Sequence, residues 1–348
     1  MNTPDIHRSV DSTKFAGLGQ RYFHYWGDDE LHLGHDEHRD IRIALCRVLK
    51  QTPTDGVIAF CGTGPRIALN RDLDSTLVGG HLTDHSELIF SDFSQDMLVR
   101  SGRTVEDISS TVASRSHLVI RDFSRRNFSA RFDALVGERI RNIRPVHDMD
   151  AFIAYIRNEI GVQEISRQQL PEDHGRIDPR LVAKPDTQQG LHFDKILHEQ
   201  RPLRLIVANL LISGMFAVTE MDFRRKLDRL RKQFPRQMTE EKFIDCLTAW
   251  HELILVLNEK VGKEFIDDAL HANEEIDGST PDIFLSADDT VTYTGLEAFD
   301  RVRMKRLKSG LPEGVSMREI DRAHWDHSHE EIPHKHTISV ALVSGREE

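Results

Sequence analysis

One segment, residues 57–98, constrains the fold of this chain more than any other stretch. It begins with an apolar run of strand length at 57–60, passes through a Gly-Thr-Gly turn into a helix-like segment, and reaches a second apolar strand at 87–90 that ends in Asp92. Glycines let backbone N–H groups approach a ligand closely, and a carboxylate at a strand tip can accept hydrogen bonds from both hydroxyls of a ribose. The segment therefore predicts a site for an adenosine-containing cofactor.

Four motifs between residues 57 and 143 resemble those of class I S-adenosylmethionine (SAM)-dependent methyltransferases. The sequence SDFSQDML at 91–98 is similar to the second-strand motif of that family, and Asp122-Phe123 is similar to the tip of its third strand. FDALVG at 132–137 is similar to its fourth strand. Together with the first strand and its glycine turn, these make four motifs in the family's order. The resemblance implies a SAM-dependent enzyme and, in this sequence, SAM as its cofactor.

The resemblance also implies which residues contact SAM. The glycine turn lines the methionine end, Asp92 binds the ribose, and Asp122 with Phe123 holds the adenine. One position departs from the family pattern, because Phe60 stands where the first strand usually carries a glycine. The cofactor-binding residues expected on this basis are Phe60, Gly62, Thr63, Gly64, Asp92, Phe93, Met97, Asp122, Phe123 and Gly137.

Candidate catalytic residues come from two segments on either side of these motifs. In the aromatic-rich segment 15–40, the residues either form an amphipathic helix that packs on the domain or close as a lid over the sulfonium, whose positive charge aromatic rings attract. Downstream, residues after the predicted fourth strand are expected near the reaction centre if they are not ordinary loop residues, and a nearby histidine is either a base or a surface residue. The candidates are Tyr22, Tyr25, Glu138, Asn142 and His147.

Apolar periodicity predicts an α/β fold with a doubly wound, Rossmann-like, mostly parallel sheet. Further strands are expected at 117–121, 132–137, 204–213, 283–286, 290–294 and 337–344. Helices are expected at 41–49, 150–160, 219–234 and 239–270. In the last of these, Leu247, Trp250, Ile254 and Leu257 fall on one apolar face.

The predicted elements divide the chain into four regions. Thr219 and Thr239 suit the N-caps of the two long helices, which the fold of the resembled family does not need. These helices are therefore expected to be an inserted cap that forms either a roof over the substrate or an oligomer interface, for example of a homodimer. The regions are an N-terminal helical lid (1–50), a SAM-binding core (51–215) with a loop at 161–200, the helical cap (216–282) and C-terminal strands that complete the sheet (283–348).

Composition narrows the partners and the compartment. The chain has 348 residues and a net charge of −11, which argues against general nucleic-acid binding. It has no apolar run near the roughly 20 residues that span a bilayer and no apolar signal centre at its N-terminus. Its three cysteines form neither a CxxC pair nor a disulfide framework. The expectation is a cytoplasmic protein that binds a small-molecule substrate, without nucleic-acid or membrane partners.

Histidine-rich stretches raise the question of a metal. The chain has 19 histidines, five of them in HWDHSHEEIPHKH at 324–336, where His327, His329 and Glu331 alternate as ligands on an extended segment do. This stretch lacks a familiar metalloenzyme spacing, and its polar, proline-containing composition is typical of a surface loop before a strand. We therefore expect no metal.

Three functions are compatible with SAM binding. The leading hypothesis is in-line SN2 transfer of the methyl group to a small molecule. In the second, Phe60 bends the methionine chain so that its γ-carbon is attacked, which gives aminocarboxypropyl transfer or closure to an azetidine ring with release of methylthioadenosine. In the third, the protein binds SAM without catalysis.

Overall fold

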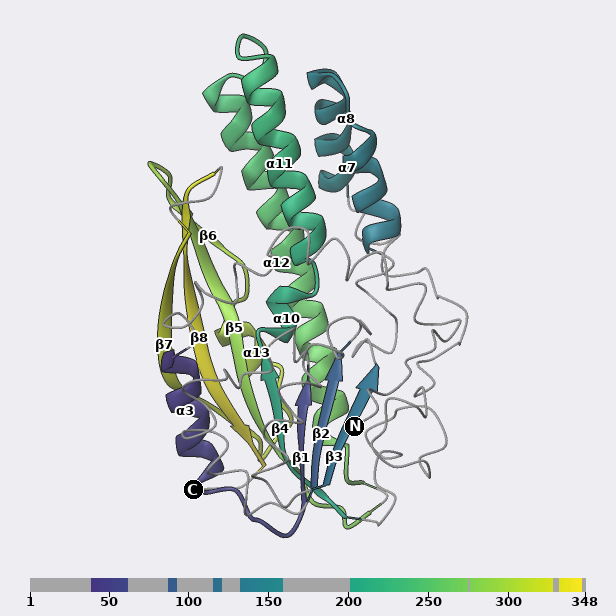
Figure 1. Cartoon of the computed structure of the whole chain (residues 1–348), viewed down its shortest axis with the longest axis vertical. Helices are drawn as coiled ribbons and strands as arrows, with labels where there is room; N and C mark the ends of the chain where they lie inside the picture. The colour runs from purple at the N-terminus through teal and green to yellow at the C-terminus, as the bar shows by residue number, and fades with distance from the viewer. Residues whose placement is uncertain are drawn as a thin grey trace, which may run out of the picture.

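The computed structural model defines a mixed α/β fold built on one open, mostly parallel sheet of eight strands, with helices packed on both faces (Figure 1). The structure describes residues 39–61, 87–92, 115–120, 132–158, 201–274, 276–327 and 332–345. No helix within these ranges is both long and apolar enough to span a membrane.

Five parallel strands form the larger part of the sheet. They are β1 (Val57–Cys61), β2 (Glu87–Asp92), β3 (Arg115–Ile120), β4 (Leu203–Asn209) and β5 (Asp282–Tyr293). Their spatial order is β3-β2-β1-β4-β5, so the chain runs outward on one side of β1 and then returns to its other side. All five therefore present their carboxyl ends at one edge of the sheet.

An antiparallel hairpin completes the sheet beyond β5. Strand β8 (His334–Ser344) pairs with β5, and β7 (Ser316–His327) pairs with β8. A short strand, β6 (Ala298–Asp300), pairs with the end of β5. The two strands predicted at 283–286 and 290–294 are thus one strand, which continues through an irregularity between Asp288 and Thr290.

The strand predicted at 132–137 is wrong. Residues Asp133–Gly137 form a π-helical turn (η2) that continues into α7 (Glu138–Asn142). Phe132, Val136 and Ile140 recur at four-residue spacing and are all fully buried, which is the pattern of one helix face. The short apolar run was compatible with both a strand and a helix, because periodicity over five or six residues does not distinguish them.

The strand predicted at 204–213 is right only as far as Asn209, because Leu210 turns the chain into a short helix at Leu211–Gly214. The predicted helices at 41–49, 150–160, 219–234 and 239–270 are confirmed within a few residues at their ends, and this short helix and the one at Met304–Lys308 were not predicted. The remaining helices are α3 (Arg39–Leu49), α8 (Val146–Arg157), α10 (Leu211–Gly214), α11 (Ala217–Gln233), α12 (Glu240–Leu270) and α13 (Met304–Lys308). Thr239 is the N-cap of α12, where its hydroxyl accepts a hydrogen bond from the Lys242 amide at 3.3 Å. Thr219 is not an N-cap, because α11 begins two residues earlier and the Thr219 hydroxyl donates to Asp133.

Alternating side chains of the sheet enter two hydrophobic layers. Ile58 and Phe60 of β1 belong to the layer covered by α3, while Val57, Ala59 and Cys61 belong to the layer covered by α12. This alternation is the period of two that a strand buried on both faces requires. The sheet therefore has no solvent-exposed face at β1.

Four helices extend beyond the carboxyl ends of the parallel strands, and we call α7, α8, α11 and the first half of α12 the helical projection (Figure 1). The predicted apolar face of α12 is confirmed, since its four residues are fully buried. Trp250 stacks on Phe223 of α11 with ring centroids 4.4 Å apart and an interplanar angle of 9°. The projection and the α12 side of the sheet share one continuous hydrophobic cluster.

Candidate functional site

The carboxyl edge of β1 and β2 carries the cofactor motif predicted from the sequence. In the register of these strands Cys61 is opposite Ser91, so Asp92 lies one residue beyond the last residue of β1. The predicted glycine turn begins immediately after Cys61. The chain therefore leaves β1 and β2 at the same level of the sheet edge.

Several of the predicted site residues lie outside the described part of the chain. They are Tyr22, Tyr25, Gly62, Thr63, Gly64, Phe93, Met97, Asp122 and Phe123. Phe60 is described, and only 2% of its surface is exposed. Its side chain belongs to the core layer between the sheet and α3.

Three predicted residues lie on the π-turn and α7, not after a strand. Gly137 is buried, and a side chain at this position would overlap the Asp133 carboxylate and approach the Arg141 guanidinium. The glycine thus leaves room for the ion pair of Asp133 and Arg141, whose atoms are 3.0 Å apart. Glu138 and Asn142 are exposed. Their assignment to a reaction centre rested on a strand end, and the helix supplies no equivalent argument.

His147 lies near the start of α8, with 80% of its side chain exposed, and its Nε2 is 3.3 Å from Asp148. A general base works from a pocket where water is controlled and the substrate is held within hydrogen-bonding reach. The exposed fraction of His147 is that of a surface residue, and not that of a base held in such a pocket.

The carboxyl end of β4 carries backbone strain. Leu210 has φ 54° and ψ 13°, the left-handed conformation, and is the one non-glycine residue with positive φ among those the structure describes. Its amide donates to the Ser286 carbonyl at 3.0 Å and to the Ser286 hydroxyl at 2.9 Å, and that hydroxyl donates to Asn209. Such strain costs about 1–3 kcal/mol and concentrates at functional sites. Because Ala208 pairs with Cys61, this strained turn adjoins the end of β1.

A second candidate site lies at the carboxyl end of β5, between the hairpin and α11. Four charged side chains, fully or almost fully buried, meet there, and we call them the buried charge cluster. They are Glu220 and Arg224 of α11, Asp288 of β5 and Arg301, which follows β6. Two positive and two negative charges balance, as burial in a low-dielectric interior requires.

Glu220 is the centre of this cluster. One of its carboxylate oxygens, Oε1, accepts hydrogen bonds from Arg224 at 2.6 Å and from Arg301 at 2.5 Å. The Nε of Arg301 lies 2.7 Å from Asp288 Oδ2, close enough for an ion pair but not aligned as a hydrogen bond. Burial alone would raise the pKa of Glu220, but Arg301 and Arg224 outweigh burial and hold this pKa well below its ordinary value.

Histidine and tyrosine side chains extend the cluster. Arg224 Nη1 donates to His334 Nε2 at 2.7 Å, and His336 Nδ1 donates to Asp288 Oδ2 at 2.6 Å. His251 of α12 is 2.9 Å from the Tyr293 hydroxyl. Burial lowers the pKa of all three histidines below the ordinary value, although carboxylates oppose it at His251 and His336, and burial raises the pKa of Tyr293 to about 12.

Several buried atoms of this region have no hydrogen-bond partner among the described residues. They include Glu220 Oε2, His251 Nδ1, Asp288 Oδ1 and Arg301 Nε. A buried polar atom without a partner costs about 1–3 kcal/mol. Buried ion pairs are themselves weak contributors to stability compared with apolar packing. The cluster is therefore retained as a second candidate site.

The sequence did not reveal the buried charge cluster. Glu220 and Arg224 are an i,i+4 pair on α11, but such pairs are common on exposed helix faces, and Asp288 and Arg301 come from elements distant in sequence, so no local pattern marks the cluster. The histidine-rich stretch was recognised, but the expectation of a surface loop is wrong for His327, His334 and His336, which lie within β7 and β8. The residues before 337 in β8, His334-Lys335-His336, include no apolar side chain, so hydrophobic alternation gave no signal that the strand extends back to them. His329 and Glu331 lie outside the described residues.

Comparisons with known proteins do not assign either site. No family model matches the chain, and no curated protein is significantly similar to it.

Proposed function

We propose that this protein is a SAM-dependent enzyme that transfers the methyl group of SAM to a small molecule. The observation that carries the proposal is the register of β1 and β2, in which the segment that begins with Gly62 and the carboxylate-bearing residue Asp92 leave the same edge of the sheet at the same level. A glycine turn and a strand-terminal acid in this relation suit the methionine and ribose portions of one nucleoside cofactor.

The strand order supports a Rossmann-like, doubly wound arrangement. In sheets with parallel order 3-2-1-4-5, ligands bind beyond the carboxyl ends of the strands, where the order reverses. Here the reversal lies between β1 and β4, which end at Cys61 and Asn209. The strained backbone at Leu210 borders this point. Three neighbouring strands thus end at one edge of the sheet: β1, from which the segment beginning with Gly62 continues, β2 at Asp92, and β4 before the strained Leu210.

In this proposal the protein mainly positions the reactants. The sulfonium makes the methyl carbon electrophilic, and aligning a nucleophile in line with the carbon–sulfur bond supplies most of the acceleration. A base is needed only where the acceptor must lose a proton early. Ribose binding is assigned to Asp92, and a lid role to Tyr22 and Tyr25, whose rings would face the sulfonium. The helical projection stands on the carboxyl side of the sheet, where a substrate roof is needed (Figure 1).

Attack at the γ-carbon of SAM is the alternative. It required Phe60 to project beside the methionine chain, but this side chain is packed in the core against α3. No observation therefore favours the alternative over methyl transfer, or favours binding without catalysis.

The test is to measure SAM binding by calorimetry and then to identify the products by mass spectrometry, with pure protein alone and with cell extract. We expect binding, and S-adenosylhomocysteine that forms only when extract supplies an acceptor. Methylthioadenosine above a protein-free blank would overturn methyl transfer in favour of γ-carbon attack. Failure to bind SAM at millimolar concentration would overturn the whole proposal.

A further inference from the structure

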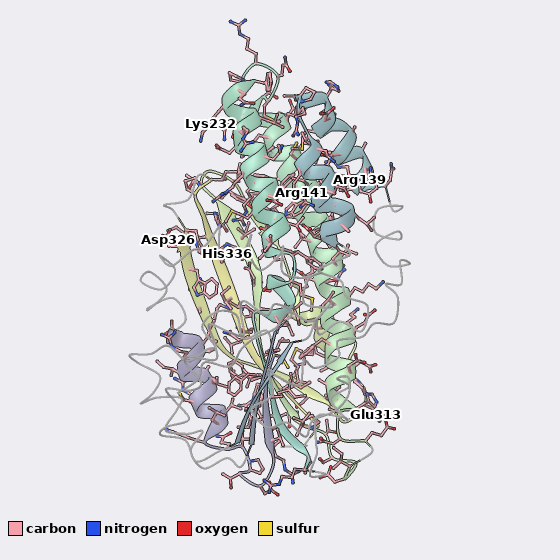
Figure 2. All side chains as sticks on the ribbon, turned by 45° about the vertical axis from the view of Figure 1, so that its right-hand side comes forward. Arg139, Arg141, Lys232, Glu313, Asp326 and His336 are labelled. Atoms are coloured by element: carbon pink, nitrogen blue, oxygen red, sulfur yellow. The ribbon has the colours of Figure 1, made fainter. Side chains whose placement is uncertain are left out.

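Three histidines of the C-terminal hairpin lie together on one face of the sheet. His327 of β7 is directly opposite His334 of β8 in the antiparallel register, and His336 lies two residues further along β8. Residues two apart on a strand share a face, and cross-strand partners are neighbours on it. The ring centroid of His334 is 5.0 Å from that of His327 and 4.8 Å from that of His336. Figure 2 shows His336 on the hairpin, below the end of the helical projection that carries Lys232.

The rings of His334 and His336 are each anchored by a hydrogen bond from their own Nδ1. His334 Nδ1 lies 2.7 Å from the Ile332 carbonyl, and His336 Nδ1 lies 2.6 Å from the Asp288 carboxylate. Both partners can only accept hydrogen bonds, so each Nδ1 carries its proton and each Nε2 keeps a lone pair. An imidazole whose outer N–H is bound to a carboxylate or a backbone carbonyl is the usual arrangement of a metal-ligating histidine.

The spacing of the three side chains is close to that of a metal site. One nitrogen from each ring lies within 4.8 Å of the other two. In a tetrahedral zinc site with Zn–N bonds of about 2.0 Å, the ligand nitrogens are about 3.3 Å apart. An ion at this position would therefore require the rings to rotate about their side-chain bonds until these nitrogens are closer together. His327 is half-buried and His334 is almost fully buried, so the site would open on one side only.

We propose that His327, His334 and His336 bind one divalent transition-metal ion, with Zn²⁺ the best suited of the common ions. Three neutral imidazoles match the ligand preference of this ion, and three protein ligands leave a fourth position for water or substrate.

Arg224 must change its contact when the ion binds. Its Nη1 lies 2.7 Å from His334 Nε2, the lone pair that the ion would take. Its Nη2 is held by Glu220 at 2.6 Å, so the guanidinium can release the histidine and stay paired. The buried charge cluster is neutral in sum, and the ion would add positive charge. The fourth ligand is therefore expected to be an anion, such as hydroxide or a substrate carboxylate.

The experiment uses untagged full-length protein, stripped with a chelator and dialysed. Calorimetric titration with Zn²⁺ should show one tight site, and Co²⁺ should give the visible absorption bands of a low-symmetry histidine-coordinated ion. His327→Ala, at a half-buried position near the end of β7, should remove this site and the Co²⁺ bands. His336→Gln should do the same.

The matched control is His324→Ala, which removes an exposed histidine from the same strand. It should bind Zn²⁺ as the unaltered protein does. Circular dichroism of each variant establishes that the chain is folded, and the decision rests on His327→Ala if His336→Gln does not fold. The proposal is overturned if the unaltered protein binds no ion in stoichiometric amount, or if His327→Ala and His324→Ala bind Zn²⁺ equally.

Discussion

The protein has two candidate sites of opposite construction. One is the sheet edge at the carboxyl ends of β1 and β2, and the other is the buried charge cluster with the histidines and tyrosine that extend it. The first is predicted from one continuous segment, residues 57–98, and its expected ligand contacts are mainly backbone amides and a single carboxylate. The second is assembled from α11, α12, β5 and the C-terminal hairpin, and its contacts are buried charged side chains. The comparison teaches that a site made from local backbone geometry leaves a readable pattern, whereas a site made from distant side chains does not.

The two sites should also respond differently to substitution. Loss of a member of the buried cluster should damage the fold, because its charges compensate one another away from water. Loss of a residue at the strand edge should damage ligand binding and leave the fold intact. Three substitutions test this difference, from the largest expected effect to the smallest.

Glu220→Gln should lower the free energy of unfolding by about 3–5 kcal/mol, because it leaves two buried guanidinium groups without their shared carboxylate. Urea denaturation measures this value. Glu319→Gln is the control, since it removes the same group from an exposed pair with Arg322, where the cost is under about 1 kcal/mol. Equal effects of the two substitutions would contradict the role of burial.

The pH dependence of Glu220→Gln sharpens the same test. The pKa of Glu220 is held well below its ordinary value, so the carboxylate stabilises the fold above the unfolded-state pKa of about 4.3, and this contribution is lost as pH falls through the folded-state pKa. The stability difference between the unaltered protein and the variant should therefore be largest near neutral pH and shrink in acid. A difference that is constant between pH 7 and pH 3 would exclude this explanation.

Asp92→Ala should weaken SAM binding by about 10- to 150-fold, the equivalent of one lost charge-assisted contact to the ribose. Its free energy of unfolding should change little. Asp55→Ala is the control, because this aspartate precedes β1 at the opposite edge of the sheet, where it pairs with Arg204 at 3.0 Å. If the two variants bind SAM equally well, the carboxyl edge is not the ribose site.

Leu210→Gly should change the free energy of unfolding by less than about 1 kcal/mol, because relief of the left-handed backbone strain offsets the lost side-chain packing. Leu205→Gly, the same substitution at a fully buried position of the preceding strand β4, should cost at least about 3 kcal/mol. Urea denaturation of both variants makes the comparison. A large loss at Leu210 would show that its side chain contributes mainly by packing.

Sequence reasoning located most of the long elements among the described residues, and the strand that it placed wrongly at 132–137 has a clear cause. The long helices α11 and α12 and the strands β1, β4 and β8 are recognisable because each is long or strongly apolar. The segment at 132–137 was too short for its periodicity to be decisive, and its resemblance to a fourth strand reinforced the error. The loss of that strand also removes the argument that placed Glu138 and Asn142 at a reaction centre.

By itself the sequence determined the alternation that builds a parallel sheet, the apolar face of α12, and the turn and acid that predict a nucleoside site, because these depend on neighbours in the chain. Only the tertiary structure decided that Glu220, Asp288 and Arg301 share one buried site, and that three histidines from two strands face one another. Such sites form where elements distant in sequence pack together, and the cost of burying their charges depends on partners that no local pattern specifies.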